Sequence, residues 1–271
     1  MDKVNALIKD MEMKMAQEKI DCPCNLDELK VGVDLGTSNI VIIVLDKDNN
    51  PVTGAIESAN VVKDGIVVDF IGAINILKRL KQQVEAKLGI ELYEAATAIP
   101  PGIMSGNIKV ISNVVEGAGF KVTKVVDEPE AAASVLNIQE GAVVDIGGGT
   151  TGISVMNNGK VAYSVDEATG GTHLTLVVAG NMNLPFTEAE GFKKSKENEK
   201  LILPIVRPVI EKMAHITMSN IPKEIKELYL VGGTSCLTGI EQVFEKYTSL
   251  RTIKPENPLL VTPIGIAMYA G

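Results

Sequence analysis

The feature that most constrains the fold of this chain is a motif that occurs twice, once in each half. Its copies are Val31–Asp46, VGVDLGTSNIVIIVLD, and Ala142–Asn157, AVVDIGGGTTGISVMN. Each copy has an apolar strand with an aspartate near its end, a turn of glycine and hydroxyl residues, and a second β-branched strand. Strand runs of this length around a glycine turn are typical of hairpins. The repeat therefore predicts two similar hairpins in two similar halves.

The composition of the two turns points to phosphate. A turn of Gly, Thr and Ser brings backbone N–H groups close to an anion, because no large side chain stands in the way. Asp34 and Asp145 occupy the same place in the two copies, and each offers a carboxylate to a hydrated magnesium ion. A single glycine turn after a strand is usually only a turn. The duplication favours two hairpins that hold a polyphosphate over purely structural turns.

Charge and cysteine content exclude several classes of protein. The net charge is −8 and no basic cluster is interleaved with aromatic residues, so we expect no nucleic-acid partner. No apolar run is long enough to cross a bilayer, and the N-terminus lacks the apolar stretch of a signal peptide. Three cysteines fit a reducing cytoplasm better than a disulfide framework, and Cys22 and Cys24 lack a second ligand pair for a metal.

The order of predicted elements indicates two α/β lobes, because strands alternate with helices twice over. We expect an N-terminal amphipathic helix and linker at 1–29, lobe I at 30–137 plus 262–271, and lobe II at 138–261. The helix has an apolar stripe of Val4, Leu7, Ile8, Met11 and Met15. It can dock on its own core, which the short linker favours, or insert into a groove of a partner.

Five motifs, whose order along the chain is that of the family, resemble those of the actin-like ATPase superfamily, which includes actin, MreB, FtsA, sugar kinases and DnaK-type chaperones. Asp34–Asn39 resembles the first phosphate motif and Asp145–Thr151 the second. Asp127–Pro129 resembles the first connecting motif, Gly232–Thr234 the adenosine motif, and Pro263–Ala267 the second connecting helix. The resemblance implies an α/β fold of two duplicated ribonuclease-H-like lobes around a nucleotide cleft, with ATP and Mg as ligands.

The resemblance also assigns roles to residues. Asp34 and Asp145 would hold Mg through water, and these two with Glu128 would be the catalytic residues. The remaining positions would bind the nucleotide: Gly36, Thr37, Ser38 and Asn39 in the first phosphate motif, Gly147, Gly148, Gly149, Thr150 and Thr151 in the second, and Gly171, Gly232, Gly233, Thr234 and Ser235 near the ribose and adenine.

The chain departs from the superfamily in three places. The spacing between motifs leaves no room for the two peripheral insertion subdomains, or at most for a helical stub in lobe II. Without the second insertion, one wall of the adenine pocket is lost. Glu190 and Lys193 either replace that wall or form a solvated helix face. Asn107 stands where MreB-like relatives carry an acidic residue, so we expect at most a slow Mg-dependent ATPase with weak nucleotide affinity.

Two histidines need no catalytic explanation. His173 follows the Gly170–Thr172 turn, where it either touches the ribose or makes a local hydrogen bond. His215 lies on a predicted helix at 203–218, packed or on its surface.

A closer resemblance, to a chaperone-like family of ethanolamine utilisation, rests on several longer stretches. These are Val61–Ala73, Pro100–Gly102, Val143–Val155, Tyr163–Leu176 and Val206–Ile216. The resemblance implies an ATP-binding assembly factor that acts by nucleotide-dependent closure of its lobes. Its partners would be ethanolamine-degrading enzymes or shell proteins of a bacterial microcompartment. The alternatives are an FtsA- or MreB-like scaffold or filament, a small-molecule kinase, and a pseudo-ATPase that only binds partners.

Overall fold

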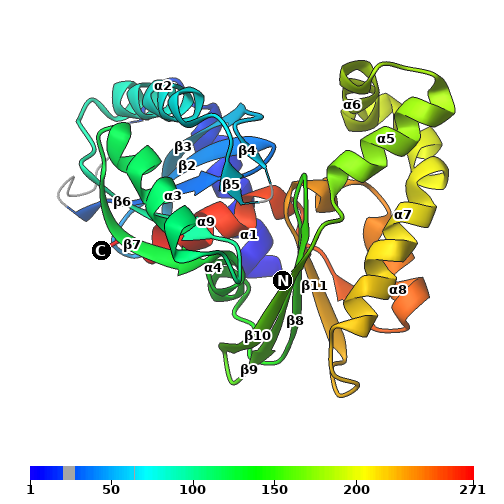
Figure 1. Cartoon of the computed structure of the whole chain (residues 1–271). Coiled ribbons are helices and arrows are strands. Elements are labelled where there is room, and N and C mark those ends of the chain that lie inside the picture. The colour runs from blue at the N-terminus through cyan, green and yellow to red at the C-terminus, as the bar shows by residue number, and fades with distance from the viewer. Residues whose placement is uncertain (21–27, 64) are drawn as a thin grey trace. The chain divides into compact units, whose positions relative to one another are not determined.

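Two five-stranded sheets organise the chain, one in each of two units (Figure 1). Unit 1 comprises Met1–Asn137 and Leu260–Gly271, and unit 2 comprises Ile138–Leu259. The computed structural model describes residues 1–20, 28–63 and 65–271. Cys22, Cys24 and the linker predicted around them lie outside the described residues, apart from Glu28 and Leu29.

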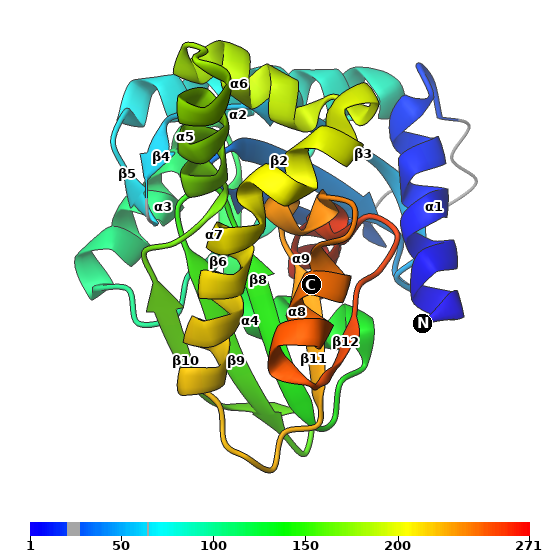
Figure 2. The same ribbon diagram turned by 90° about the vertical axis from the view of Figure 1, so that its right-hand side faces the viewer.

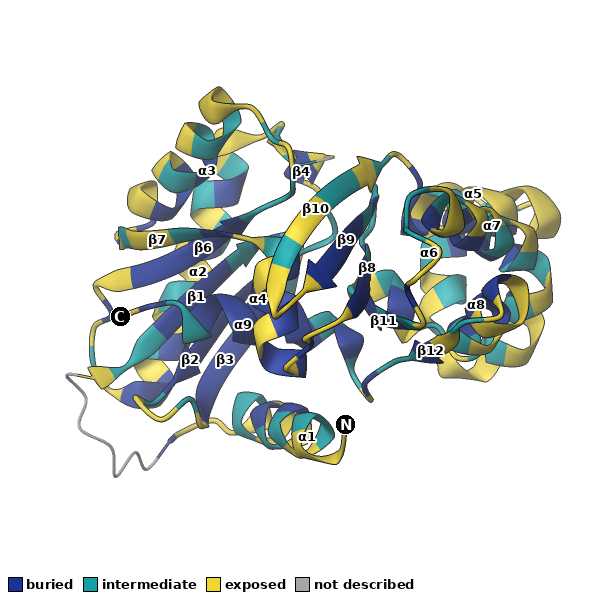
Figure 3. Ribbon diagram, turned by 90° about the horizontal axis from the view of Figure 1, so that it is seen from below, coloured by how far each residue is buried: buried dark blue, intermediate teal, exposed yellow. Residues whose placement is uncertain are grey.

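The sheet of unit 1 has the strand order β3-β2-β1-β6-β7. Three strands, β1 (Lys30–Leu35), β2 (Asn39–Leu45) and β3 (Pro51–Ser58), form an antiparallel meander, and β6 (Glu94–Ile99) and β7 (Lys121–Asp127) run parallel to β1. A two-stranded hairpin, β4 (Val62–Lys63) with β5 (Ile66–Val67), follows β3. Figure 3 shows that the central strands are buried along most of their length.

The two faces of this sheet pack against different helices, because side chains alternate along a strand. Val31, Val33 and Leu35 join one core with α2 (Phe70–Leu88) and α3 (Ser105–Gly117). The other face packs against α4 (Glu128–Leu136) and α9 (Val261–Met268). There α9 lies so close that a Cβ on Gly32 would be 2.4 Å from the Ala267 nitrogen. Asp34 follows Gly32 by two residues on β1, so it lies on the same face of the sheet as Gly32, the face that packs against α4 and α9.

Helices α4 and α9 stand beside the two points where the chain passes between the units, after Asn137 and before Leu260. They pack without an intervening side chain, since a Cβ on Gly265 would be 2.0 Å from the Ala131 carbonyl oxygen. The Tyr269 hydroxyl donates to Glu130 at 3.2 Å. Burial, followed by the negative charge of Glu130, raises the pKa of Tyr269 to about 12.

Helix α1 (Asp2–Ala16) packs on β3 of unit 1, so the prediction that it docks on its own core is confirmed. Ile8 and Met11 of the predicted stripe are fully buried. Lys87, near the end of α2, is also buried, and its ammonium donates to the carbonyl oxygens of Met15 at 2.6 Å and Gly54 at 3.4 Å. Burial lowers the pKa of Lys87.

Unit 2 repeats the same sheet, with the order β10-β9-β8-β11-β12. Here β8 (Gly141–Ile146), β9 (Thr151–Asn157) and β10 (Lys160–Glu167) form the meander, and β11 (Glu227–Val231) and β12 (Arg251–Ile253) run parallel to β8. Helices α5 (Gly171–Met182), α7 (Glu199–Ser219) and α8 (Ile240–Thr248) cover the face that carries Val144 and Ile146. Asp145 lies on the opposite face, as Asp34 does in unit 1.

Between the meander and the fourth strand, each unit carries little beyond its core. Among the described residues there, unit 1 has the β4–β5 hairpin and α2, and unit 2 has α5, α6 (Phe186–Lys194), a 3₁₀ turn at Lys196–Asn198 and α7. The predicted loss of the peripheral insertions, down to a helical stub in unit 2, is therefore confirmed. Figure 2 shows α7 and α8 side by side, with α6 beyond the start of α7.

Helix boundaries differ from the sequence prediction mainly in unit 2. Most of α6 lies in the polar segment 188–200, and α7 begins at Glu199 instead of Leu203. Pro204 and Pro208 lie inside α7, where each removes one backbone donor from the helix. Among the described residues, no helix has the length and apolar character needed to span a bilayer.

Candidate functional site

The two copies of the sequence motif form hairpins with the same register. In β1–β2, Asp34 pairs with Val41 and Leu35 with Ile40. In β8–β9, Asp145 pairs with Gly152 and Ile146 with Thr151. Each hairpin therefore closes with a four-residue loop, 36–39 in unit 1 and 147–150 in unit 2. The aspartate sits one residue before the last pair in both.

The loop of unit 1 is fastened to β3 at its second half. The Ser38 carbonyl accepts from the Ala59 N–H at 3.0 Å, and the Asn39 side chain accepts from the Ser58 hydroxyl at 3.3 Å. A Cβ on Gly36 would lie 2.9 Å from the Asn39 carbonyl oxygen, so the turn requires glycine there. The structure thus brings Gly36, Thr37, Ser38 and Asn39 together in one tight turn, as the sequence indicates.

The loop of unit 2 is fastened to the first turn of α5. The N–H of Gly171 donates to the Gly147 carbonyl at 3.0 Å, and the N–H of Thr172 donates to the Gly148 carbonyl at 2.8 Å. A Cβ on Gly170 would be 2.6 Å from the carbonyl carbon of Gly149. Glycine at 170 is therefore required for the helix to approach the loop backbone this closely.

The third glycine segment, Gly232–Ser235, meets the same loop from β11. The Thr234 hydroxyl donates to the Gly147 carbonyl at 2.7 Å. Gly232 has φ +87°, and a Cβ there would be 2.2 Å from an oxygen of the Asp145 carboxylate. Two segments far apart in sequence, the start of α5 and Gly232–Ser235, thus converge on the loop 147–150 within unit 2, and Gly232 also approaches Asp145.

Two of the predicted binding residues use their hydroxyls inside the unit. Thr151 is fully buried and donates to the Thr169 carbonyl at 2.5 Å. Ser235 is also fully buried and donates to the Val231 carbonyl at 2.7 Å. These two side chains hold the backbone of the loops in place, so any contact with a ligand would come from their backbone.

Several backbone N–H groups of the two loops are available as hydrogen-bond donors. Within each unit, the described residues provide no acceptor for the backbone N–H groups of Thr37 and Ser38 or of Gly148, Gly149 and Thr150. Unpaired N–H groups on a glycine turn form a concave site for an anion. The donor set therefore fits a phosphate group, and the neighbouring carboxylates of Asp34 and Asp145 fit a hydrated divalent cation.

Glu190 and Lys193 of α6 are not a solvated helix face. The Lys193 ammonium donates to the Gly171 carbonyl at 3.0 Å and to the Thr175 hydroxyl at 2.7 Å, and it pairs with Glu190 at 2.7 Å. Burial lowers the pKa of Lys193. Burial acts to raise the pKa of Glu190, but hydrogen bonds from Lys193 and Thr175 outweigh it and lower that pKa. The only sequence signal for this pair is its i, i+3 spacing on a helix.

The remaining polar candidates of unit 1 stand at one edge of the sheet. Asp34, Asn107 and Glu128 lie at or after the carboxyl ends of β1, β6 and β7, which are neighbouring parallel strands. Strands two apart are separated by about 10 Å, which is the spacing between the ends of β1 and β7, where Asp34 and Glu128 stand. Burial, and then the charge of Glu130, raises the pKa of Asp127 beside Glu128.

Both histidines have local partners. The Gly170 N–H donates to His173 Nδ1 at 3.2 Å, which supports the local role over a ribose contact. His215 Nδ1 is 3.2 Å from the Tyr247 hydroxyl, and the two rings pack edge to face. Among the described residues, no group of three or more His, Cys, Asp or Glu side chains gathers around a common point.

Comparison with known proteins assigns the family. Over 241 residues the chain is 44% identical to the ethanolamine utilization protein EutJ of Salmonella typhimurium, covering 88% of this chain and 85% of that protein. The chain belongs to the EutJ family. The crystal structure of EutJ from Carboxydothermus hydrogenoformans matches with a TM-score of 0.93 and 47% identity, over 99% of both chains.

More distant comparisons place the EutJ fold among the actin-like ATPases. The family model of MreB/Mbl protein matches residues 50–187, and that of cell division protein FtsA matches residues 142–265. MreB 5 of Spiroplasma citri, solved with AMPPNP, has a TM-score of 0.72 at 17% identity, over 89% of this chain and 95% of that one. The predicted actin-like fold of duplicated α/β lobes is therefore confirmed.

Proposed function

We propose that this chain is an ATP-binding, chaperone-like or assembly factor for ethanolamine utilisation. The observation that carries the proposal is the convergence of two glycine segments, the start of α5 and Gly232–Ser235, on the loop 147–150. The N–H groups of Gly148, Gly149 and Thr150 have no acceptor among the described residues of unit 2. A loop of the same register recurs in unit 1 at 36–39. The β- and γ-phosphates of ATP would bind to these two loops.

The nucleoside would bind beside α5 and β11 in unit 2. Backbone groups of Gly171 and Gly232–Ser235 would face the ribose and adenine. Glu190 and Lys193 would replace the wall that the missing insertion supplies in larger relatives. The Lys193 ammonium is already hydrogen-bonded to the Gly171 carbonyl and paired with the Glu190 carboxylate. A pocket with a reduced wall buries less of the base, so weak affinity is expected.

Hydrolysis would be slow or absent. Asp34 and Asp145 would hold Mg through water, and the ion neutralises phosphate charge when bound. Glu128 is the carboxylate that could accept a proton from water at the sheet edge. The Asn107 amide can orient water but cannot accept its proton. Because the site has one such carboxylate instead of two, it orients the attacking water less well.

The output of nucleotide binding would be a change in the relation of the two units. The chain crosses between them only after Asn137 and before Leu260, so few residues need to alter their backbone for a hinge motion. Because EutJ relatives are named as ethanolamine utilization proteins, we propose ethanolamine-degrading enzymes or microcompartment shell proteins as partners, in the cytoplasm.

Calorimetric titration of Mg·ATP tests the nucleotide site. We expect affinity between micromolar and low millimolar for the wild type, weakened about tenfold or more in Asp145→Ala. Asp48→Ala, in an exposed turn of unit 1, is the matched control and should bind as the wild type does. The absence of binding heat in all three proteins would contradict the proposal and leave a pseudo-ATPase that binds only partners.

A scaffold or filament protein is the second candidate, because models of FtsA and MreB/Mbl match large parts of the chain. Sedimentation with Mg·ATP over a concentration series separates the two. A polymer would pellet above a critical concentration, whereas an assembly factor would remain in the supernatant at every concentration.

A further inference from the structure

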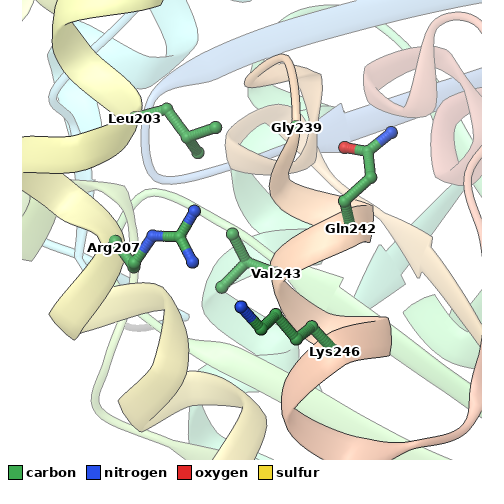
Figure 4. A pocket seen from close by; sticks show the side chains of 6 residues that line it. All are labelled: Leu203, Arg207, Gly239, Gln242, Val243 and Lys246. Atoms are coloured by element: carbon green, nitrogen blue, oxygen red, sulfur yellow. The ribbon is translucent and has the colours of Figure 1, made fainter.

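A pocket opens between α7 and α8 of unit 2, away from the glycine loops described above. Its volume is about 140 Å³, and it is lined by Leu203, Arg207, Gly239, Gln242, Val243 and Lys246. Figure 4 shows Leu203 and Arg207 projecting from α7 toward Gln242, Val243 and Lys246 of α8. The pocket therefore belongs to one unit and does not depend on how the units are arranged.

The apolar wall of the pocket depends on a glycine at the start of α8. Gly239 precedes α8 with φ +89°, and a Cβ there would be 2.6 Å from a methyl group of Leu203. Leu203 and Val243 thus form a smooth wall beside the first turn of α8. Val243 is 3% exposed, so its side chain is held in place by the core of unit 2.

Two cations point into the same space. The Arg207 side chain comes from α7 and the Lys246 side chain from α8, and both line the pocket (Figure 4). Arg207 has Glu211 as a partner at the limiting distance of 4.0 Å, with both side chains more than 40% exposed. For Lys246, the described residues include no hydrogen-bond or ion-pair partner. Two like charges beside one pocket are stabilised when an anion lies between them.

Glu241, next to Gln242 on α8, already has partners. The Glu241 carboxylate pairs with Lys254 at 2.7 Å and accepts from the Gln242 amide at 3.1 Å. That hydrogen bond leaves the amide oxygen of Gln242 as an acceptor at the pocket rim. The pocket thus offers two cations, one amide and an apolar wall, on a chain whose net charge is −8.

The size of the pocket selects the class of ligand. Sites for small molecules occupy ~300–1,000 Å³, well above the 140 Å³ found here. One amino-acid side chain with its neighbour's methyl groups fits this smaller space. A carboxylate would be bound bidentately by arginine, whose planar fork matches it, and lysine would add a point charge.

We propose that the α7–α8 pocket binds an acidic–apolar peptide segment of a partner protein. An Asp or Glu carboxylate lies between Arg207 and Lys246, and an adjacent aliphatic side chain packs on Leu203 and Val243. This inference goes beyond the nucleotide site and requires no nucleotide, so it stands or fails independently of ATP binding.

Methyl NMR of the full chain, labelled at Leu and Val and free of nucleotide, tests the proposal. The probe is acetyl-Val-Glu-Leu-amide, and acetyl-Val-Gln-Leu-amide is its uncharged match. We expect saturable shifts of the Leu203 and Val243 methyl signals with the Glu peptide at millimolar concentration and none with the Gln peptide. In Arg207→Gln/Lys246→Gln, the affinity for the Glu peptide should fall about tenfold or more.

Lys212→Gln provides the matched control, because Lys212 is an exposed cation of α7 that does not line the pocket. It should bind the Glu peptide as the wild type does. The proposal is overturned if the Glu peptide gives no saturable shift, if the Gln peptide gives the same shift, or if the double variant binds equally well. Equal saturation by inorganic phosphate would also overturn it, because the site would then recognise a bare anion.

Discussion

The hydroxyl of Thr234 donates a hydrogen bond to the carbonyl of Gly147, 87 positions earlier in the chain, at 2.7 Å. The same carbonyl accepts from the Gly171 N–H at 3.0 Å. A Cβ on Gly171 would be 2.4 Å from the Thr234 hydroxyl oxygen, so this side chain lies directly against the backbone at the start of α5. One carbonyl therefore fixes the loop 147–150 against both α5 and the end of β11.

Replacement of Thr234 by Val removes the donor and keeps the shape of the side chain. The Gly147 carbonyl would keep one of its two partners, so the free energy of unfolding should fall by about 1 kcal/mol. The loop would lose its tie to β11, and Mg·ATP affinity should fall about fivefold to tenfold by calorimetry. Thr234→Ser retains the hydroxyl and should match the wild type. Unchanged affinity in Thr234→Val would mean that the bonds from Gly171 and Thr172 of α5 are enough to order the loop.

Gly265→Ala tests the contact between α4 and α9. The added Cβ would meet the Ala131 carbonyl oxygen at 2.0 Å, and backbone atoms on both sides must then shift. We expect a loss of about 3 kcal/mol or more in urea unfolding, at the upper end for overpacked sites. Gly180→Ala is the control, because nothing lies within 4 Å of its added Cβ. That helical substitution should stabilise by about 0.5–1 kcal/mol. Equal stability of the two variants would show that α4 and α9 separate at little cost.

The hairpins and their loops could be predicted from the sequence, because the residues that define them are close together in the chain. Glycine and hydroxyl residues between β-branched runs define both the turn and its length, and the repeat at Asp34 and Asp145 identifies the equivalent positions. The lobes follow from the order of strands and helices. The roles of these residues in binding nucleotide stay predictions.

Features that depend on distant neighbours could not be predicted. Nothing in the sequence marks Lys87 as buried, and the sequence allows two interpretations of Lys193. Lys87 is buried and Lys193 largely buried, each against backbone carbonyls that come near only when the chain folds. The hydroxyls of Thr151 and Ser235 looked like phosphate or ribose ligands, and tertiary packing directs them to carbonyls inside the unit. The short strand β12 has three residues, too few for an alternation pattern.

Lys87→Met should loosen α1. The ammonium of Lys87 joins the last turn of α1 to β3 through the carbonyls of Met15 and Gly54. Its loss removes about 1–1.5 kcal/mol from that attachment, which corresponds to about tenfold faster amide hydrogen exchange in α1. Exchange in α2 should not change. Lys78→Met, on the exposed side of α2, is the control. Full protection of α1 in Lys87→Met would indicate that Ile8 and Met11 suffice to hold it.

The ion pair of Glu190 with Lys193 should make the stability of unit 2 depend on pH in acid. The folded pKa of Glu190 is lowered below its ordinary value of 4.5, because hydrogen bonds from Lys193 and Thr175 outweigh burial. A carboxyl group whose pKa is lowered on folding contributes stability at pH above its unfolded pKa. That stability is lost as pH falls through the folded pKa.

We expect Glu190→Gln to be less stable than the wild type by about 1 kcal/mol from pH 5 to 7 in urea unfolding. The difference should shrink as pH falls below 4.5. Glu188→Gln, in the exposed first turn of α6, should follow the wild type throughout. A wild-type advantage that persists at pH 3 would mean that the Glu190 side chain acts through packing and not through its charge.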